Sequence, residues 1–508
     1  MTKNFFHYIN ILCLILFFSW WLPVIAHEHN DIHNLTKHVK PLKEGSVLTI
    51  QDCIYTGLKN SPIIKRQKYN LDIAKSNVGI AKSAFFPTLG VGAGINHQSN
   101  TNKEDFYSVY RELPNVNAVL NMMIWDFGRS SAKIRMEEFN KIAAEYEFED
   151  SVCFTVFDIK IKYYNLLKAL SLLQVENINS DINKQIALDI SQLIKENKKN
   201  KIDLLNTQVE EFVIKNRIIE ANREVNNSQS DLNNSIYYVN APHYKILKTP
   251  TYKDDYFEKI KPISNIKLKA NISKSDTKLY KLHFTLKEAT DIAYKNNPDL
   301  KALIATKDAM EQALLVVKRS YYPSLNVNAG YDYINSNHYR NNSFSAGVNL
   351  NTDLNAMELK YNIDNATAQI HLAETEIEKF KQDLYISVEK ALNNVEKTEK
   401  EISIAKQQAE KANENLKATI TDYKNNKLTR LDMQNARELY INALTDYVNS
   451  IYNYNISLIK LEMSMHYHLV DLHEHTEHAL EHHDDEIIND FDKAMKCKKR
   501  HSKKVEKL

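Results

Sequence analysis

The sequence predicts a mainly α-helical protein with a small β part, in which one structural unit occurs twice. Three observations predict this fold: glycine and proline are scarce, two distant segments match each other, and four segments alternate between apolar and polar residues. The 508 residues include only 9 glycines and 10 prolines, and residues 348–508 contain neither. Because glycine and proline most readily interrupt a helix, the chain favours long antiparallel helical hairpins and disfavours glycine-rich nucleotide-binding loops.

Residues 1–26 have the pattern of a secretory signal peptide. Lys3 precedes the apolar stretch Ile9–Leu22, and Val24 and Ala26 are placed as in a cleavage site. An uncleaved membrane anchor is the alternative, but the apolar stretch is short for one. No later run of about 18 apolar residues could cross a bilayer as a helix. We therefore expect an exported protein.

Residues 48–94 align with residues 284–330 without a gap, which indicates an internal duplication. In each copy two prolines divide the segment into a short helix, a second helix and a strand. Each copy also begins with a threonine followed three residues later by an acid, the spacing of a capping box. The identical residues at these boundaries are Thr49/Thr285, Asn60/Asn296, Pro62/Pro298, Pro87/Pro323 and Gly94/Gly330.

After each second helix the apolar pattern changes to a period of two, which predicts β-hairpins within 88–125 and 324–352. Each hairpin has two strands of about nine to eleven residues, apolar on one face and rich in Asn, Gly and Ser on the other. This pattern is typical of the wall of a transmembrane β-barrel. The alternative is a pair of surface hairpins on a soluble core, but the polar faces carry few charges and most glycines are concentrated here.

Four strands are too few to close a barrel. A lipid-facing sheet with open edges leaves backbone groups without hydrogen-bond partners, at a cost of several kcal/mol each. Other copies of the chain must therefore complete the wall, and the sequence predicts an obligate homo-oligomer in contact with membrane lipid.

Long helical segments follow each hairpin. Apolar residues in 353–426 recur at steps of three, four and seven, which predicts a coiled-coil-like seam. About 70 helical residues span roughly 105 Å. A polar turn after Tyr423 precedes a returning helix that ends near Met465, and the first copy repeats this arrangement over 130–239 with a turn at 196–201. The seam residues are Ile377, Leu384, Val388, Ala391, Val395, Ile402, Ala405 and Ala409.

These patterns divide the chain into six segments. They are the signal peptide at 1–26, a histidine-containing segment at 27–47, a first repeat at 48–239, a linker at 240–283, a second repeat at 284–465, and a tail at 466–508 that is rich in histidine and then in lysine.

Several function classes are disfavoured. The 66 basic and 64 acidic residues nearly cancel, so the chain lacks the general basic footprint of a nucleic-acid-binding protein. No nucleophile–base constellation, zinc-protease motif or phosphate-binding loop is present. We therefore expect no nucleic-acid partner, no catalysis and no cofactor.

The order of these features resembles the TolC-type outer-membrane efflux proteins. The resemblance covers about 48–465 and depends on the duplicated unit, the Phe-Phe-Pro-Thr-Leu and Tyr-Tyr-Pro-Ser-Leu sequences, the Trp-Asp-Phe-Gly-Arg sequence at 125–129, and the motif at 423–432. It implies a homotrimer with twelve strands in one barrel, continued by an α-helical tunnel across the periplasm. It also implies an inner-membrane pump and a periplasmic adaptor (membrane fusion) protein as partners.

The resemblance also implies a constriction at the periplasmic mouth of the tunnel. The tyrosine of the family matches Tyr423 and its first aspartate matches Asp432, while Asp203 has the corresponding place in the first copy. Leu428 and Asn435 replace the arginine and the second aspartate, so part of the implied charge network is missing. An ordinary acid at a helix start is the alternative role for Asp432.

The turns at the hairpin tips are the expected docking surface for the adaptor. The candidate contact residues are Lys198, Asn200, Asn425, Asn426 and Lys427.

Eleven of the 18 histidines lie near the two ends of the chain once the leader is removed. On a helix, His475, His478 and His482 would share one face, and imidazole is a common ligand of transition metals. The histidine-rich tail is therefore either a metal-binding site or a flexible segment that has no part in transport.

The sequence thus predicts a passive exit duct of the outer membrane that extends into the periplasm. Its cargo is left open between drugs, divalent metals and, in type I secretion, proteins. An exported coiled-coil scaffold or adhesin without a pore is the alternative from another class.

Overall fold

The structure is a computed structural model of the whole chain. It describes residues 45–101, 108–238, 241, 244–246, 285–336, 339–352 and 355–467. The predicted signal peptide, the three candidate metal ligands, most of the predicted linker and nearly all of the tail lie outside these residues.

The fold contains two copies of one unit, each with two shorter helices, a β-hairpin and two long helices. The first copy comprises α3 (Ile50–Asn60), α4 (Pro62–Lys82), the one-turn helix η1 (Ser83–Phe85), β2 (Thr88–Thr101), β3 (Ser108–Trp125), α5 (Arg129–Lys195) and α6 (Lys201–Ser235). The second comprises α8 (Leu286–Asn296), α9 (Pro298–Arg319), β5 (Ser324–Ser336), β6 (Tyr339–Asn351), α10 (Ala356–Lys424) and α11 (Arg430–Met465). Two short strands, β1 (Val47–Leu48) and β4 (Lys245–Ile246), pair in parallel beside them.

The predicted capping boxes are confirmed. The Asp52 N–H donates to the Thr49 hydroxyl at 3.1 Å, and the Thr49 N–H donates to the Asp52 carboxylate at 2.9 Å. Thr285 and Glu288 make the same pair of bonds, at 3.3 and 2.9 Å. Each reciprocal pair satisfies two backbone N–H groups that a helix start leaves without partners, so both copies begin in the same way.

The four long strands form one antiparallel sheet in the order β2-β3-β5-β6. They are longer than predicted, since β2 has 14 residues, β3 has 18, and β5 and β6 have 13 each. The prediction was too short because the apolar alternation ends before the strands do. Backbone pairing continues through polar residues as far as Thr101 and Ser108.

The sheet has two chemically different faces. Apolar side chains are exposed on one of them, including Val91 at 72% and Phe344 at 75%. On the other face glycines lie beside amide side chains of the next strand. An added Cβ at Gly92 would lie 2.4 Å from Asn117 Oδ1, which explains why glycine occupies this position.

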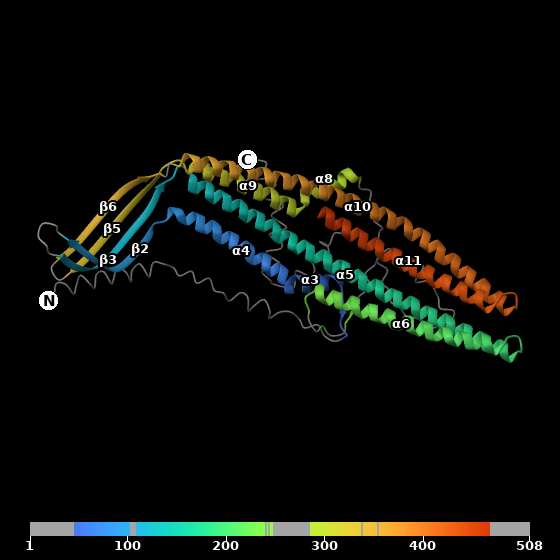
Figure 1. Cartoon of the computed structure of the whole chain (residues 1–508). Coiled ribbons are helices and arrows are strands. Elements are labelled where there is room, and N and C mark those ends of the chain that lie inside the picture. The colour runs from blue at the N-terminus through green and yellow to red at the C-terminus, as the bar shows by residue number, and fades with distance from the viewer. Residues whose placement is uncertain are drawn as a thin grey trace, which may run out of the picture.

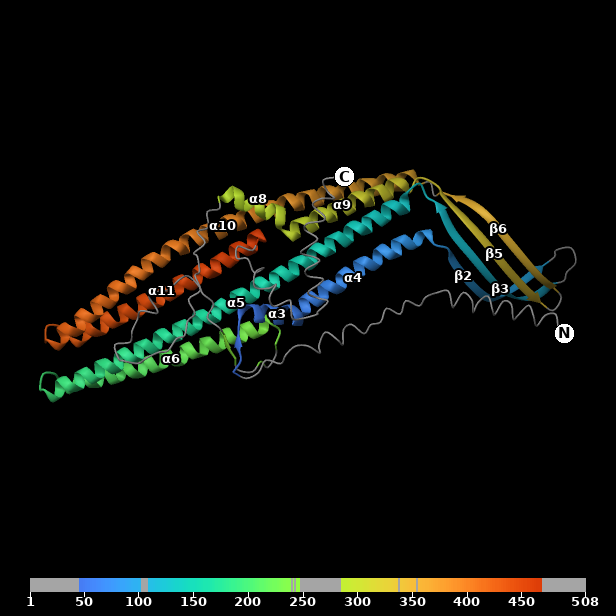
Figure 2. The same ribbon diagram turned by 180° about the vertical axis from the view of Figure 1, so that it is seen from behind.

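The long helices leave the sheet as two hairpins that run together to the far end of the molecule (Figure 1). α5 packs against α4, α9, α6 and α11, and α10 packs against α9, α11 and α8. Figure 2 shows from behind that α4 and α9 accompany the halves of α5 and α10 nearer the sheet, while α6 and α11 accompany the halves nearer the tips. Among the described helices, none is apolar over a long enough stretch to cross a membrane.

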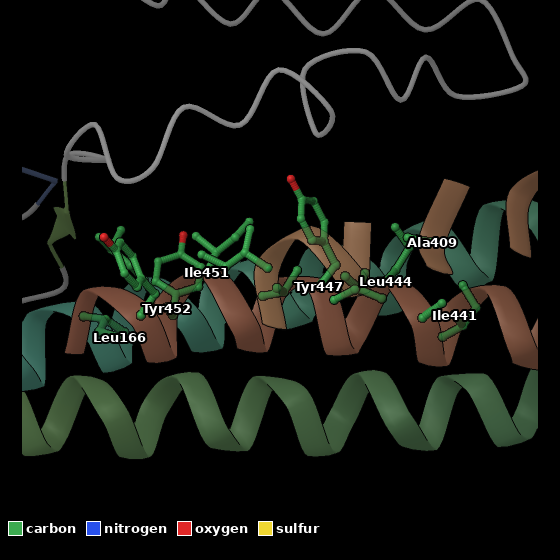
Figure 3. Packing of buried hydrophobic residues seen from close by; sticks show 14 of the residues in the cluster. Leu166, Ala409, Ile441, Leu444, Tyr447, Ile451 and Tyr452 are labelled. Carbon is green, nitrogen blue, oxygen red and sulfur yellow. The ribbon is translucent and has the colours of Figure 1, made fainter. Parts of the chain in front are cut away.

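The core is a continuous apolar seam between α5, α10 and α11. Leu444, Tyr447 and Val448 on α11 are completely buried. Figure 3 shows Leu166 from α5 and Ala409 from α10 among the α11 side chains of this cluster. The predicted seam of α10 is confirmed at Leu384, Val388, Val395, Ile402, Ala405 and Ala409, which are all buried.

Candidate functional site at the helical tips

The two hairpin tips have the same backbone conformation. Asn197 and Asn426 adopt left-handed φ values of 58° and 62°, a conformation that asparagine tolerates better than most residues. The next residue in each turn closes the helix end, since the Lys198 N–H donates to the Leu193 carbonyl and the Lys427 N–H donates to the Asp422 carbonyl, both at 2.9 Å. The duplication therefore extends to the end of the molecule that lies farthest from the sheet.

Two of the three predicted constriction residues meet at this end. The Tyr423 hydroxyl at the end of α10 donates to Asp203 Oδ2 in the first turn of α6 at 2.9 Å. Tyr423 is only 2% exposed, and its burial, together with the bond to Asp203, raises the pKa of its hydroxyl. The Lys199 ammonium lies 3.9 Å from the centre of the Tyr423 ring. A cation over an aromatic face adds an attractive contact between the hairpins.

The third predicted residue, Asp432, lies apart from this pair. Its carboxylate accepts the Thr429 N–H at 2.8 Å and the Thr429 hydroxyl at 2.6 Å, which forms the capping box of α11. These bonds from Thr429 lower the pKa of Asp432. Among the described residues, no hydrogen bond joins Asp432 to Tyr423 or Asp203. The geometry of Asp432 is that of the acid at a helix start.

The five candidate docking residues are all exposed in the two turns. Lys198 pairs with Glu196 at 2.8 Å and Lys427 lies 3.7 Å from Asp422. Asn200 caps α6 by accepting the Ile202 N–H at 3.4 Å. The lysine charges are thus partly balanced within the turns, and the exposed surface of the tips is polar rather than strongly basic.

A charged network that was not predicted from the sequence lies slightly farther from the tips. Arg437 on α11 is 2% exposed and contacts Glu210 on α6, which also binds Arg430. Arg437 occupies a position of the repeating apolar pattern that also contains Met433, Tyr440 and Leu444, all of them buried. A charged residue inside an apolar seam was the available sequence signal for this network.

No cluster that could hold a metal ion occurs in the part of the chain that the structure describes. Cys53 is buried there, and burial raises the pKa of its thiol to about 12, so Cys53 packs as a small apolar side chain. At the described tips, hydrogen bonds and ion pairs join the two hairpins, as between Tyr423 and Asp203 and between Lys424 and Asp189.

Comparison with known proteins identifies similar chains. The model of the family described as "Outer membrane efflux protein" matches residues 53–236 and 290–465. The solved structure of CusC is 14% identical with a TM-score of 0.67, over 82% of this chain and 91% of that chain.

Two further solved structures have similar folds. The CmeC outer membrane channel of Campylobacter jejuni is 14% identical with a TM-score of 0.66, over 82% of this chain and 85% of that chain. The outer membrane protein VceC of Vibrio cholerae is 13% identical with a TM-score of 0.65, over 82% and 95%. No curated protein sequence matches the chain.

Proposed function

Because the chain belongs to the outer membrane efflux protein family, we propose that it is a passive exit duct in the outer membrane of the cell, with its helices in the periplasm. Three copies form the duct, a periplasmic adaptor joins it to an inner-membrane pump, and the pump supplies the energy. Its cargo is that of an efflux or a type I secretion system, and the chain itself catalyses no reaction.

The observation that carries this proposal is the open-edged sheet with an exposed apolar face. Among the described strands, β2 and β6 each pair with one neighbour only. Their outer edges therefore carry backbone N–H and C=O groups that lipid cannot satisfy. An edge-to-edge union of β6 in one copy with β2 in the next satisfies these groups and leaves the apolar face toward lipid.

The helices have matching lateral faces below the two sheet edges. Five apolar residues of α6 recur at steps of three, four and seven and are at least half exposed, opposite the buried residues Thr207 and Ile214. This stripe consists of Ile202, Leu205, Val209, Phe212 and Ile219. An exposed apolar stripe of this spacing is the seam of a helix pair with one partner missing.

Exposed apolar residues also mark the other lateral helix. Met357, Tyr361 and Leu372 are each at least 60% exposed at the sheet end of α10, which follows the free edge strand β6, and Ile404 is 64% exposed in the tip half of α10, at the level of the α6 stripe. One copy can therefore place α6 beside α10 of the next. Such a head-to-tail contact uses two different surfaces, and it closes into a ring when the rotation between copies allows.

At the periplasmic end we assign Tyr423 and Asp203 to the closed mouth, Asp432 to the charge at its rim, and the five exposed turn residues to adaptor docking. We also propose that the two predicted repeats, 48–239 and 284–465, each contribute one β-hairpin and one long helical hairpin to the wall of the duct. We propose His475, His478 and His482 in the tail as ligands of a divalent cation. Titration with Zn²⁺ of the whole chain and of a variant without these three histidines tests this, because the variant should bind Zn²⁺ more weakly.

Conductance and mass together test the proposed function. The detergent-extracted full-length protein should have the native mass of three copies and should form ion-conducting pores in planar bilayers. A water-soluble single chain without conductance would contradict the proposal and favour the scaffold or adhesin. The identity of the adaptor and pump that copurify with the protein then distinguishes export of drugs from export of metals or of proteins.

A further inference from the structure

A histidine lies where two helices of the second repeat meet, near the middle of the molecule. α9 begins where α11 ends, and both helices pack along α10 (Figure 2). His466 follows α11 with a left-handed φ of 45° and closes this helix. Its side chain is 12% exposed and lies between Asn297, the N-cap of α9, and Asp150 on α5. We call these three residues the α9–α11 joint.

The hydrogen bonds of Asn297 fix the position of the proton on His466. The Asn297 side-chain oxygen accepts the Leu300 N–H at 2.8 Å, so its NH2 group is the one that faces the imidazole. This NH2 group lies 3.1 Å from His466 Nδ1, which must therefore accept. The single proton of a neutral imidazole is then on Nε2, which donates to Asp150 Oδ1 at 3.1 Å. Both contacts of the joint exist together only when His466 is neutral.

Protonation of His466 removes one of these two contacts. An imidazolium carries a second N–H group on Nδ1, which would face the Asn297 NH2 group with no acceptor between them. The Asn297 amide is held in place, because turning it over would take its oxygen away from Leu300 and uncap α9. The bond to Asp150 remains and becomes charge-assisted. Acid therefore separates the end of α11 from α9, while the contact with α5 is kept.

Other charged groups near the joint do not replace the lost contact. Lys160 and Glu462 are buried and pair with each other at 2.9 Å. Among the described residues, no hydrogen bond or ion pair joins His466 to a charged group of α8 or α10. The charged side chains of this region are Asp150, Glu147 and Lys160 on α5, Asp299 on α9 and Glu462 on α11.

Asp299 titrates in the same range as the joint but acts in the opposite direction. Burial, with a further contribution from Asp150, raises the pKa of its carboxyl to about 6. A carboxyl with a raised pKa stabilises the fold in acid, because the folded state holds the proton more tightly. A loss of structure in acid at this joint therefore requires a different group, and imidazole is the side chain that changes its charge near neutral pH.

The first repeat has the same backbone at the equivalent position but different side chains. Tyr237 follows α6 with a left-handed φ of 53°, and its N–H donates to the carbonyl three residues before it, as the His466 N–H does. Ser61 is the N-cap of α4, and the alignment of the repeats places Ile63 opposite Asp299. The described equivalent of the joint thus has a tyrosine and an isoleucine where the second repeat has an imidazole and a carboxyl.

We propose that His466 makes the α9–α11 joint sensitive to pH: the neutral imidazole connects the two helices, and the imidazolium releases α9. The equivalent position between α6 and α4, with Tyr237, keeps its structure over the same range, so acid loosens one side of each chain. The proposal goes beyond the proposed duct and does not depend on it, because every contact of the joint lies within one chain.

Hydrogen exchange of the full-length protein, followed by mass spectrometry at about pH 7.5 and about pH 5.5, tests the joint. Protection is expressed relative to the intrinsic exchange rate at each pH, so that only structural opening is compared. In acid, the last turns of α11 and the first turns of α9 should lose protection by about fivefold, the change expected when one hydrogen bond is lost. The end of α6 and the start of α4 should keep their protection.

Three variants identify the group that responds. His466→Gln does not titrate and should abolish the difference between the two pH values. Asn297→Asp keeps a cap for α9 and supplies an acceptor for the imidazolium, so acid should strengthen the joint of this variant. His371→Gln is the control, because His371 is an exposed histidine of α10 that pairs with Glu374 at 3.0 Å, and this variant should respond like the wild type.

The wild type alone can overturn the proposal. Equal protection of the α9–α11 joint at both pH values, or an equal loss in both repeats, would show that no local pH response exists there. A wild-type response in the His466→Gln variant would assign the response to another group and would also overturn it. Asp299→Asn removes the other group that titrates in this range and should leave the loss of protection in place.

Discussion

The Tyr423 hydroxyl donates to Asp203 Oδ2 at 2.9 Å, so a single hydrogen bond joins the last turn of α10 to the first turn of α6. The two residues are 220 positions apart in the sequence. Their contact exists because both hairpins end at the same level. Loss of the Tyr423 hydroxyl would therefore remove this link between the two hairpins.

Tyr423→Phe should open the mouth more often. The change removes the hydroxyl but keeps the buried ring, and a hydrogen bond to a charged group contributes about 1.5–3 kcal/mol. We expect a several-fold rise in mean conductance in planar bilayers, with Tyr69→Phe on the exposed face of α4 as the control. Because the pKa of Tyr423 is raised, the wild-type conductance should stay constant between about pH 7 and pH 9. Equal conductance of both variants and wild type would contradict the assignment.

The exposed stripe of α6 should be required for assembly. Phe212→Glu places a charge in the middle of the apolar residues and should shift the native mass in detergent from three copies toward one. The cost of burying an unpaired charge is several kcal/mol, enough to dissociate a subunit contact. Asn222→Glu adds the same charge to an exposed position of α6 outside the stripe and should leave the mass unchanged. An intact trimer of the Phe212→Glu variant would exclude the stripe from the subunit contact.

Asp299 should make the fold less stable above pH 6. Its burial, with a further contribution from Asp150, raises the pKa of this carboxyl to about 6. The folded state therefore retains a proton that the unfolded state has lost, and stability falls as the pH rises from about 4 to 6. Asp299→Asn should increase the free energy of unfolding by about 1–2 kcal/mol at pH 7, less than the full pKa shift implies because solvent screens this partly exposed carboxyl, and should have little effect at pH 4.

Thermal unfolding in detergent at the two pH values checks this expectation. Asp364→Asn on the exposed face of α10 is the control for removing one carboxylate. A stabilisation by Asp299→Asn of the same size at pH 4 and pH 7 would show that titration of Asp299 is not the cause.

Replacing each of two glycines on neighbouring helices by alanine should change the stability of the protein in opposite directions. An added Cβ at Gly57 on α3 would lie 2.3 Å from Ile159 Cδ1, whose side chain is fully buried. Gly57→Ala should therefore destabilise the fold by about 1–3 kcal/mol through overpacking. Gly79 on α4 has no atom within 4 Å of an added Cβ, so Gly79→Ala should stabilise the helix by about 0.5–1 kcal/mol. The unfolding temperatures of the two variants and of the wild type measure these changes. A Gly57→Ala variant that unfolds at the wild-type temperature would contradict the packing argument.

The local features of the fold could be predicted from the sequence. Thr49 and Thr285 cap their helices as expected because a capping box depends only on residues three positions apart. Strand ends could not be placed in this way, because backbone pairing extends β3 beyond its alternating residues. The missed partnership of Arg437 with Glu210 depends on how two hairpins align. A single sequence carries no pattern that fixes that alignment.

α5 and α10 each continue without a break from the end of the sheet to the tips, over 67 and 69 residues. A helix of this length is a rod of roughly 100 Å, so a tilt of one end of the helix also moves the other end. A tilt of one degree at the end of the sheet displaces the tip by roughly 1.8 Å over that length, more than half the length of a hydrogen bond. The sheet and the tips are therefore mechanically linked, and in the proposed outer-membrane duct a change in the tilt of the sheet within the lipid would move the tips.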